Sequence, residues 1–498
     1  MAVGKTVIIV FLLFIVSILT RIPLVENMHS HTDSSSITLA LVNYDLNQET
    51  PAPPGYPLYL TFGKLIYYIV RDPHQALIIV SIISTALGAL GFYFLGKYLD
   101  HENTGIISAI VFLSSPAIFF FGLTIYPYLF MIGIEVLFVF FAYITIFKKR
   151  NTAIFIGVFY ALLLGIRPQE ILLTLPLAVY VIYKLSNKAK LHALVAFGVI
   201  TIAWLMPFIF VNGGVRNYYY ILSNGASEAL PLPSFNPLIY KRFELLNGAF
   251  VTLGVSSIFA IYQLIKMLIG NKKTNYLILL ALWAIPSLLF NLFIRTEHAG
   301  YQQGYLMPCI LLASIALRRV YSVRKILAIV CIAIVVLINL YIFFYNRDPL
   351  YQKPYRQSSF HYTDIVRNDY VLSEKFKYIK SNFAPDKTII FAGPYFWRHV
   401  RYYLPEFEIY MIGRLFEEED SNLLIKAYGL RFEKIWNTNR TLDLPDKVTS
   451  IVIFDDEGSS FEINKKRIVK FKGITSLTIV PVSRAMQIGY HKIYTVIK

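Results

Sequence analysis

The residues best suited to chemistry lie together in one polar stretch near the N-terminus. It reads ENMHSHTDSSS over residues 26–36 and carries two imidazoles, His29 and His31, followed by one carboxylate, Asp33. The two histidines are either surface groups or two ligands of a metal site completed elsewhere, because an i, i+2 spacing fits both. Asp33 could cap a following helix by accepting a backbone N–H. The positions of these residues relative to the membrane bear on which interpretation holds.

A second segment of note follows about twenty residues later. It reads PPGYPLY over residues 53–59, and its prolines and glycine form either a rigid anchor for the far side of the polar loop or an ordinary turn. The apolar stretch 60–70 behind it is too short to span a bilayer and contains Lys64. We expect this stretch to lie in the membrane interface.

The composition indicates which elements must position these residues. Of 498 residues, 56% are hydrophobic and only 15% are charged, too few to cover a soluble protein of this size. The net charge of +17 could suggest nucleic-acid binding, but most basic residues before Asp348 stand in short runs between apolar segments. We therefore predict a polytopic membrane protein surrounded by lipids, with no nucleic-acid partner. Both cysteines lie in apolar segments, which argues against a disulfide framework or a cysteine zinc site.

Eleven apolar segments are candidates for membrane helices. The first, residues 6–20, is followed by no cleavage site and is interpreted as an anchor; the others begin near residues 75, 104, 125, 152, 168, 191, 249, 275, 301 and 326. Lysine and arginine concentrate in alternate loops, which predicts a cytoplasmic N-terminus and places everything after Arg347 outside. The predicted domains are a membrane domain over 1–346, with long outer loops at 22–74 and 212–248, and an extracytoplasmic domain over 347–498.

The predicted outer domain has the pattern of an α/β fold. Strands are expected at residues 387–392 (KTIIFA), 407–412 and 449–454 (TSIVIF), with a helix or turn over 394–403. The segment 394–403 holds Tyr395, Phe396 and Trp397 beside Arg398 and His399. This aromatic cluster could stack on a sugar or simply pack in a core.

The layout resembles the GT-C class of membrane glycosyltransferases, which includes the protein O-mannosyltransferases and the lipid A aminoarabinose transferases. The resemblance covers the membrane part and, by placement alone, the tail. Four features carry the resemblance: HTDS at residues 31–34, PPGYPLY at 53–59, LGIRPQE at 164–170 and HAGYQQGYLMP at 298–308. None of them is specific alone; their order, their spacing and the side of the membrane on which they lie together indicate the class.

The resemblance implies transfer of a sugar from a polyprenyl-phosphate donor to a glycan, lipid or protein acceptor outside a plasma membrane, with inversion. An acceptor hydroxyl must lose a proton as it attacks, which makes Asp33 the candidate base. Arginine suits the phosphate of the leaving lipid, and the candidates for binding it are Arg167, Arg295, His298 and Lys64. The alternative for both arginines is snorkelling toward headgroups. Four further residues are substrate-site candidates: His31, Tyr56, Glu170 and Tyr301.

The sequence also differs from the families that it resembles. The protein O-mannosyltransferases carry an Asp-Glu pair where this chain has Asp33 followed by Ser34, which argues against protein mannosylation. The Asp-x-Asp-like metal site of the oligosaccharyltransferases is not reproduced, because Ser35 stands two residues after Asp33. We therefore predict that no cofactor or catalytic metal is required; nothing in the loop indicates a divalent ion.

Two other functions compete with glycosyl transfer. A transporter or flippase of lipid-linked sugars would place charges at mid-membrane, and the sequence shows few there. A membrane scaffold gives no reason for so long and polar a first loop.

Overall fold

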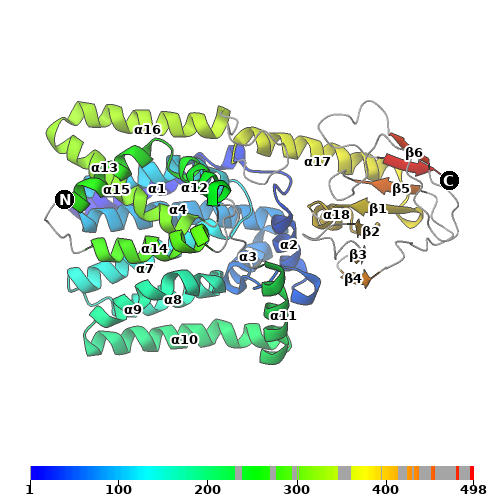
Figure 1. The fold of residues 1–498 in the computed structure, drawn as a ribbon, viewed down its shortest axis with the longest axis horizontal. Coiled ribbons are helices and arrows are strands. Elements are labelled where there is room, and N and C mark those ends of the chain that lie inside the picture. The colour runs from blue at the N-terminus through cyan, green and yellow to red at the C-terminus, as the bar shows by residue number, and fades with distance from the viewer. Residues whose placement is uncertain are drawn as a thin grey trace. The chain divides into compact units, whose positions relative to one another are not determined.

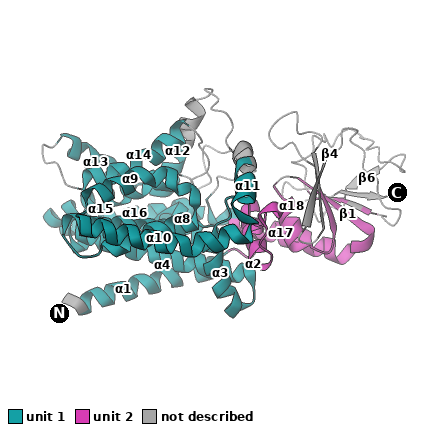
Figure 2. Ribbon diagram, turned by 90° about the horizontal axis from the view of Figure 1, so that it is seen from below, with its two compact units in different colours: residues 1–25, 53–364 teal, residues 26–52, 365–498 magenta. Residues whose placement is uncertain are grey.

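The computed structural model describes residues 2–229, 238–269, 276–293, 300, 302–345, 360–393, 395–412, 423–428, 431–436, 450–454, 478–481 and 494–497. The chain divides into two compact units, residues 1–25 with 53–364 and residues 26–52 with 365–498 (Figure 2). The predicted first loop, 22–74, is therefore shared between them, and its polar part belongs to the unit that holds the C-terminal residues. The predicted domain boundary at 346 lies outside the described residues, so it stays a prediction.

The first unit consists of α-helices (Figure 1). Their bounds are α1 Ala2–Leu19, α3 Pro57–Val70, α4 Pro73–Leu99, α5 Glu102–Ser114, α6 Pro116–Phe121, α7 Tyr128–Phe147, α8 Ala153–Ile166, α9 Ile171–Lys184, α10 Asn187–Val211, α11 Gly214–Ala229, α12 Leu238–Leu253, α13 Ser256–Ile269, α14 Leu277–Phe293, α15 Gln303–Val323 and α16 Lys325–Tyr345. Local signals set several of these ends. Asp72 caps α4 by accepting the Gln75 N–H at 2.8 Å. Pro73 suits the first helical position because it has no backbone N–H, a group that would have no partner within the helix there.

Among the described residues, six helices are long and apolar enough to cross a membrane: α1, α4, α7, α10, α15 and α16. A seventh span is formed if α12 and α13, which are bent by 106° at their junction, are counted as one. Shorter apolar helices occupy 102–114, 153–166 and 277–293, where the sequence also predicts spans. The predicted total of eleven is thus not confirmed and stays a prediction, while α3, with 14 residues, has the short length expected of its segment.

Close helix contacts hold the first unit together where glycine permits them. At Gly157 of α8, an added Cβ would lie 2.0 Å from the Ala193 carbonyl oxygen of α10. No side chain fits at that distance, so the approach of α8 to α10 requires glycine at this position.

The second unit contains α2 (Thr32–Val42), α18 (Trp397–Tyr403) and most of α17 (Tyr362–Asn382), together with a seven-stranded mixed sheet. The strand order is β4-β3-β2-β1-β5-β7-β6, and β1 pairs in parallel with both β2 and β5 while the other pairs are antiparallel. The strands are β1 Thr388–Ala392, β2 Glu408–Ile412, β3 Leu423–Tyr428, β4 Arg431–Trp436, β5 Ser450–Ile453, β6 Thr478–Pro481 and β7 Tyr494–Ile497. The three strands predicted from the sequence are present as β1, β2 and β5.

The core of the second unit lies between the central strands and two helices. Phe376 and Ile379 of α17 and Trp397 of α18 pack with buried residues of β1, β2 and β5. Met28 from the polar N-terminal stretch packs against the same cluster. The predicted aromatic cluster is therefore divided: Trp397 is a core residue, whereas Tyr395 is exposed.

Candidate active site

Asp33 stands in the first turn of α2, but it does not cap that helix. The cap is His31, whose Nδ1 accepts the Asp33 backbone N–H at 3.0 Å. The interpretation of Asp33 as N-cap is therefore wrong, because Asp33 already lies inside the helix, at its second position, and His31 occupies the cap position. An Nδ1 that accepts carries no proton, so the 3.7 Å contact between it and Asp33 Oδ2 is not a charged pair. The Asp33 side chain stays 39% exposed.

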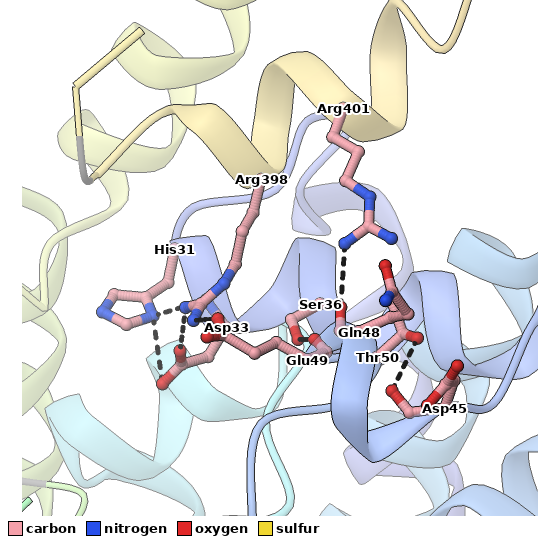
Figure 3. A network of polar contacts seen from close by, with 9 residues as sticks. All are labelled: His31, Asp33, Ser36, Asp45, Gln48, Glu49, Thr50, Arg398 and Arg401. Atoms are coloured by element: carbon pink, nitrogen blue, oxygen red, sulfur yellow. Dashed lines mark hydrogen bonds and ion pairs between the residues drawn. The ribbon is translucent and has the colours of Figure 1, made fainter. Parts of the chain in front are cut away.

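Arg398 of α18 reaches this carboxylate and a second one (Figure 3). Its Nη1 lies 3.3 Å from Asp33 Oδ1, and its Nη2 donates to Glu49 Oε2. The three side chains come from the N-terminal stretch and from a helix about 350 residues later, yet all belong to the second unit. The Arg398 side chain is only 16% exposed, which strengthens its interaction with both anions relative to a fully solvated pair.

A tight turn positions Glu49 toward α18. Asp45 and Thr50 exchange two backbone hydrogen bonds, at 2.8 and 3.0 Å, and Ser36 of α2 donates to the Glu49 carbonyl. Arg401, one turn after Arg398, donates to the Gln48 carbonyl at 2.9 Å (Figure 3). Burial lowers the pKa of the Arg401 guanidinium to about 10, so it remains charged at neutral pH. Together these bonds hold residues 45–50 against α18.

A second set of contacts fixes the chain just before Asp33. His399 Nε2 donates a hydrogen bond to the His29 carbonyl at 3.0 Å. The backbone N–H of His29 donates to the Tyr403 hydroxyl, also at 3.0 Å. Asp369 of α17 accepts the backbone N–H of Met28 at 2.8 Å. Burial lowers the pKa of His399 to about 4 and raises that of Tyr403, so both side chains are neutral at pH 7. His29 and His31 thus serve as a packed residue and a cap.

Arg167 and Glu170 form a separate buried pair in the first unit. Arg167 Nη1 lies 2.8 Å from Glu170 Oε1 and 3.5 Å from the Met131 sulfur, and the guanidinium stacks over the Tyr128 ring at 5.0 Å. Arg167 is only 2% exposed. Snorkelling toward headgroups is therefore excluded for Arg167, and a phosphate role would have to compete with Glu170 for the guanidinium.

The remaining predicted residues are partly described. Lys64 lies in the middle of α3 and is half-buried, and Tyr56 caps the same helix in a left-handed conformation, with φ 49°. Arg295, His298 and Tyr301 lie outside the described residues. Within the part of the chain that the structure describes, no three His, Cys, Asp or Glu side chains group as a metal site would require. The prediction on metals stays a prediction.

The sequence does not predict that Arg398 contacts Asp33, nor that Glu49 shares the same guanidinium. Glu49 lies in the predicted loop and Arg398 in the aromatic cluster of the tail, and no spacing rule connects positions so far apart. The one available signal was that cluster, where Arg398 and His399 follow a core tryptophan on a short helix.

No protein-family model and no curated protein matches the sequence. Among solved structures, the chain is similar to ArnT from Cupriavidus metallidurans bound to undecaprenyl phosphate, with a TM-score of 0.61, 11% identity, and coverage of 100% of this chain and 98% of that one. The apo state of the same protein gives a TM-score of 0.58 at 12% identity, over 99% of this chain and 98% of that one.

The chain has the GT-C fold. The likeness confirms the predicted helical GT-C fold, while the number of membrane helices and the extracytoplasmic placement of the C-terminal domain stay predictions. The GT-C fold together with the apolar helices makes the chain a multi-pass membrane protein. The oligosaccharyltransferase from Archaeoglobus fulgidus is similar at a TM-score of 0.49 and 10% identity, over 80% of this chain and 63% of that one. At these identities the likeness establishes the GT-C fold, and the reaction must be argued from the residues.

Proposed function

We propose that this protein is a membrane glycosyltransferase that moves a sugar from a polyprenyl-phosphate donor to a hydroxyl of a glycan, lipid or protein acceptor. The observation that carries the proposal is Asp33: a part-exposed carboxylate, fixed in the first turn of α2 beside Arg398, in a chain with the GT-C fold. The ArnT structure with a TM-score of 0.61 is bound to undecaprenyl phosphate, and this supports a lipid-linked donor for the present protein.

The reaction is a single displacement at the anomeric carbon. The acceptor oxygen attacks that carbon as its O–H proton passes to the Asp33 carboxylate. The bond between the anomeric carbon and the phosphate oxygen breaks, and the polyprenyl phosphate leaves with the electron pair. A positioned base of this kind contributes about 10²- to 10⁴-fold to the rate. One displacement inverts the configuration, in keeping with the expectation from the resemblance.

The departing lipid phosphate needs a cation near the membrane surface. Lys64 is our candidate among the described residues, because it is half-buried on a short apolar helix that suits the interface and has no carboxylate partner in the described part of the chain. Arg295 and His298 remain candidates through the resemblance. Arg167 is the weaker candidate, since Glu170 already neutralises it. We place the reaction on the outer face of the plasma membrane, with the N-terminus in the cytoplasm and the second unit outside.

The experiment supplies the purified protein in lipid nanodiscs with a panel of polyprenyl-phosphate sugars and sugar or lipid acceptors. Release of free polyprenyl phosphate and formation of a glycosylated acceptor are both measured. We expect both products to form with one donor class, in equal amounts. In liposomes, movement of the labelled donor across the bilayer without release of free lipid phosphate would instead indicate a flippase and contradict the proposal.

A further inference from the structure

Arg398 contacts two carboxylates, and only one of them is the candidate base. Each amino group of its guanidinium takes a different partner, Asp33 through Nη1 and Glu49 through Nη2 (Figure 3). A guanidinium usually binds one carboxylate with both arms. Here the fork is divided, so Asp33 and Glu49 share one positive charge.

We propose that Arg398 is a positioning residue that holds the Asp33 carboxylate ionised and correctly oriented, and that Glu49 sets how much of the Arg398 charge Asp33 receives. This inference deepens the proposed function, on which it rests. It makes the short helix α18 of the C-terminal part a component of the catalytic centre, because that helix carries the cation for a base located 365 residues earlier in the sequence.

The geometry favours this role over binding of the donor phosphate. Both arms of the Arg398 guanidinium already engage carboxylates, and the side chain is mostly buried, with 16% exposed. A phosphate would have to displace Asp33 or Glu49 from a charged contact. Asp33 is the more exposed partner, at 39% against 20% for Glu49, so the substrate reaches the carboxylate more easily than the arginine.

The neighbouring groups determine the direction of the effect. Asp33 faces the cation Arg398 and the ring of His31, while Glu49 contacts the other arm of Arg398. Arg401 interacts electrostatically with Arg398, Glu49 and Asp45. An adjacent cation favours the ionised form of a carboxylate, and an adjacent anion disfavours it. Removing Arg398 should therefore make Asp33 keep its proton to higher pH, whereas removing Glu49 should have the opposite effect because both arms of Arg398 can then turn to Asp33.

The test follows the protonation of Asp33 directly, without turnover. Full-length protein in nanodiscs is labelled with a carbodiimide and an amine between pH 3 and 8, and modification of Asp33 itself is located and quantified by tandem mass spectrometry, which separates it from Glu26, Asp45 and Glu49 on the same stretch. Only the protonated carboxyl reacts, so the labelling curve has a midpoint. We expect Arg398→Gln to raise that midpoint by about one pH unit, and Glu49→Gln to lower it by a smaller amount. Arg398→Lys, which keeps the charge, should stay close to the wild type.

Lys380→Gln is the matched control, because it removes one positive charge from an exposed site on α17 of the same unit. It should leave the midpoint unchanged. Equal midpoints for Arg398→Gln and Lys380→Gln would overturn the inference, as would a midpoint for Glu49→Gln that moves upward. If Arg398→Gln does not fold, the opposite displacement expected for Glu49→Gln and the behaviour of Arg398→Lys still decide.

Turnover separates this inference from the proposed function. In an active enzyme, the acid limb of the pH profile of kcat/KM should move in the same direction as the labelling midpoint, with KM for the donor unchanged at the optimum. A raised donor KM without displacement of the acid limb would assign Arg398 to the phosphate instead. If the wild type shows no transfer but the midpoints move as expected, the proposed function fails while the coupling of Arg398 to Asp33 stands.

Discussion

His399 should make the second unit less stable in acid. Its buried ring has a pKa of about 4, against 6.5 for an ordinary histidine, because burial disfavours the charged form. Between these two values the unfolded chain binds a proton that the folded chain does not, so the free energy of unfolding falls as the pH drops from 6.5 toward 4. At 1.36 kcal/mol for each pKa unit, the loss is about 3 kcal/mol by pH 4.

The assay compares wild type with His399→Gln by urea unfolding in nanodiscs at pH 7, 6, 5 and 4. Both proteins carry phenylalanine in place of Trp204, Trp283 and Trp436, so that fluorescence comes from the buried Trp397, two residues before His399, and reports on this unit. Glutamine can still donate to the His29 carbonyl but does not titrate, so the stability difference between the two proteins isolates the proton of His399. The wild type should lose about 3 kcal/mol relative to the variant between pH 7 and pH 4. His192→Gln, at an exposed position of α10, is the control.

A difference between wild type and His399→Gln that does not change with pH would refute the reasoning. So would a wild type that gains stability relative to the variant in acid, since the folded state would then bind the proton more tightly than the unfolded chain. In either case the His399 ring would be accessible to solvent or paired with an anion.

Two further predictions concern the membrane unit, and both are measured by thermal unfolding. Arg167→Met should destabilise this unit by about 3–5 kcal/mol, because it leaves Glu170 as an unpaired buried carboxylate; combining it with Glu170→Leu should recover most of that loss. A stable Arg167→Met variant that only fails to bind the donor would instead assign Arg167 to the phosphate. Gly157→Ala should lower the free energy of unfolding by about 1–3 kcal/mol, because the added Cβ would collide with the Ala193 carbonyl. Gly198→Ala, where nothing lies within 4 Å of an added Cβ, is the control and should be neutral or slightly stabilising. Equal melting temperatures for the two variants would show that α8 and α10 are not so closely packed.

Local patterns predicted the elements well. Runs of β-branched and aromatic residues indicated β1, β2 and β5, and the apolar segments indicated the helices of the first unit, because these signals depend only on neighbours in the sequence. The number of membrane spans was harder to predict. Hydropathy does not show that Pro116 interrupts the segment after α5, or that the chain bends by 106° between α12 and α13.

The candidate site was predictable only in part. Asp33 could be selected from one loop, because its chemistry and position are local properties. Its partners could not, since Arg398 is about 365 residues away and is brought to Asp33 by the packing of α18 with α2 inside the second unit. The sequence makes His31 a substrate-site candidate and offers the helix cap as one alternative for Asp33, but in the structure His31 is the cap of α2. Arg167 was chosen for its charge at a helix end, but its burial with Glu170 depends on tertiary contacts.

The most direct test of the account compares Asp33→Asn with Asp45→Asn in the transfer assay. Both variants exchange a carboxylate for an amide in residues 26–52, but asparagine at position 45 can still cap the short helix Leu46–Gln48 that Asp45 caps. If Asp33 is the base, Asp33→Asn should lower kcat by about 10²- to 10⁴-fold with KM for the donor little changed, and Asp45→Asn should keep near wild-type kcat. Equal kcat for wild type and Asp33→Asn would remove Asp33 from the centre of the reaction and contradict the mechanism proposed for this protein.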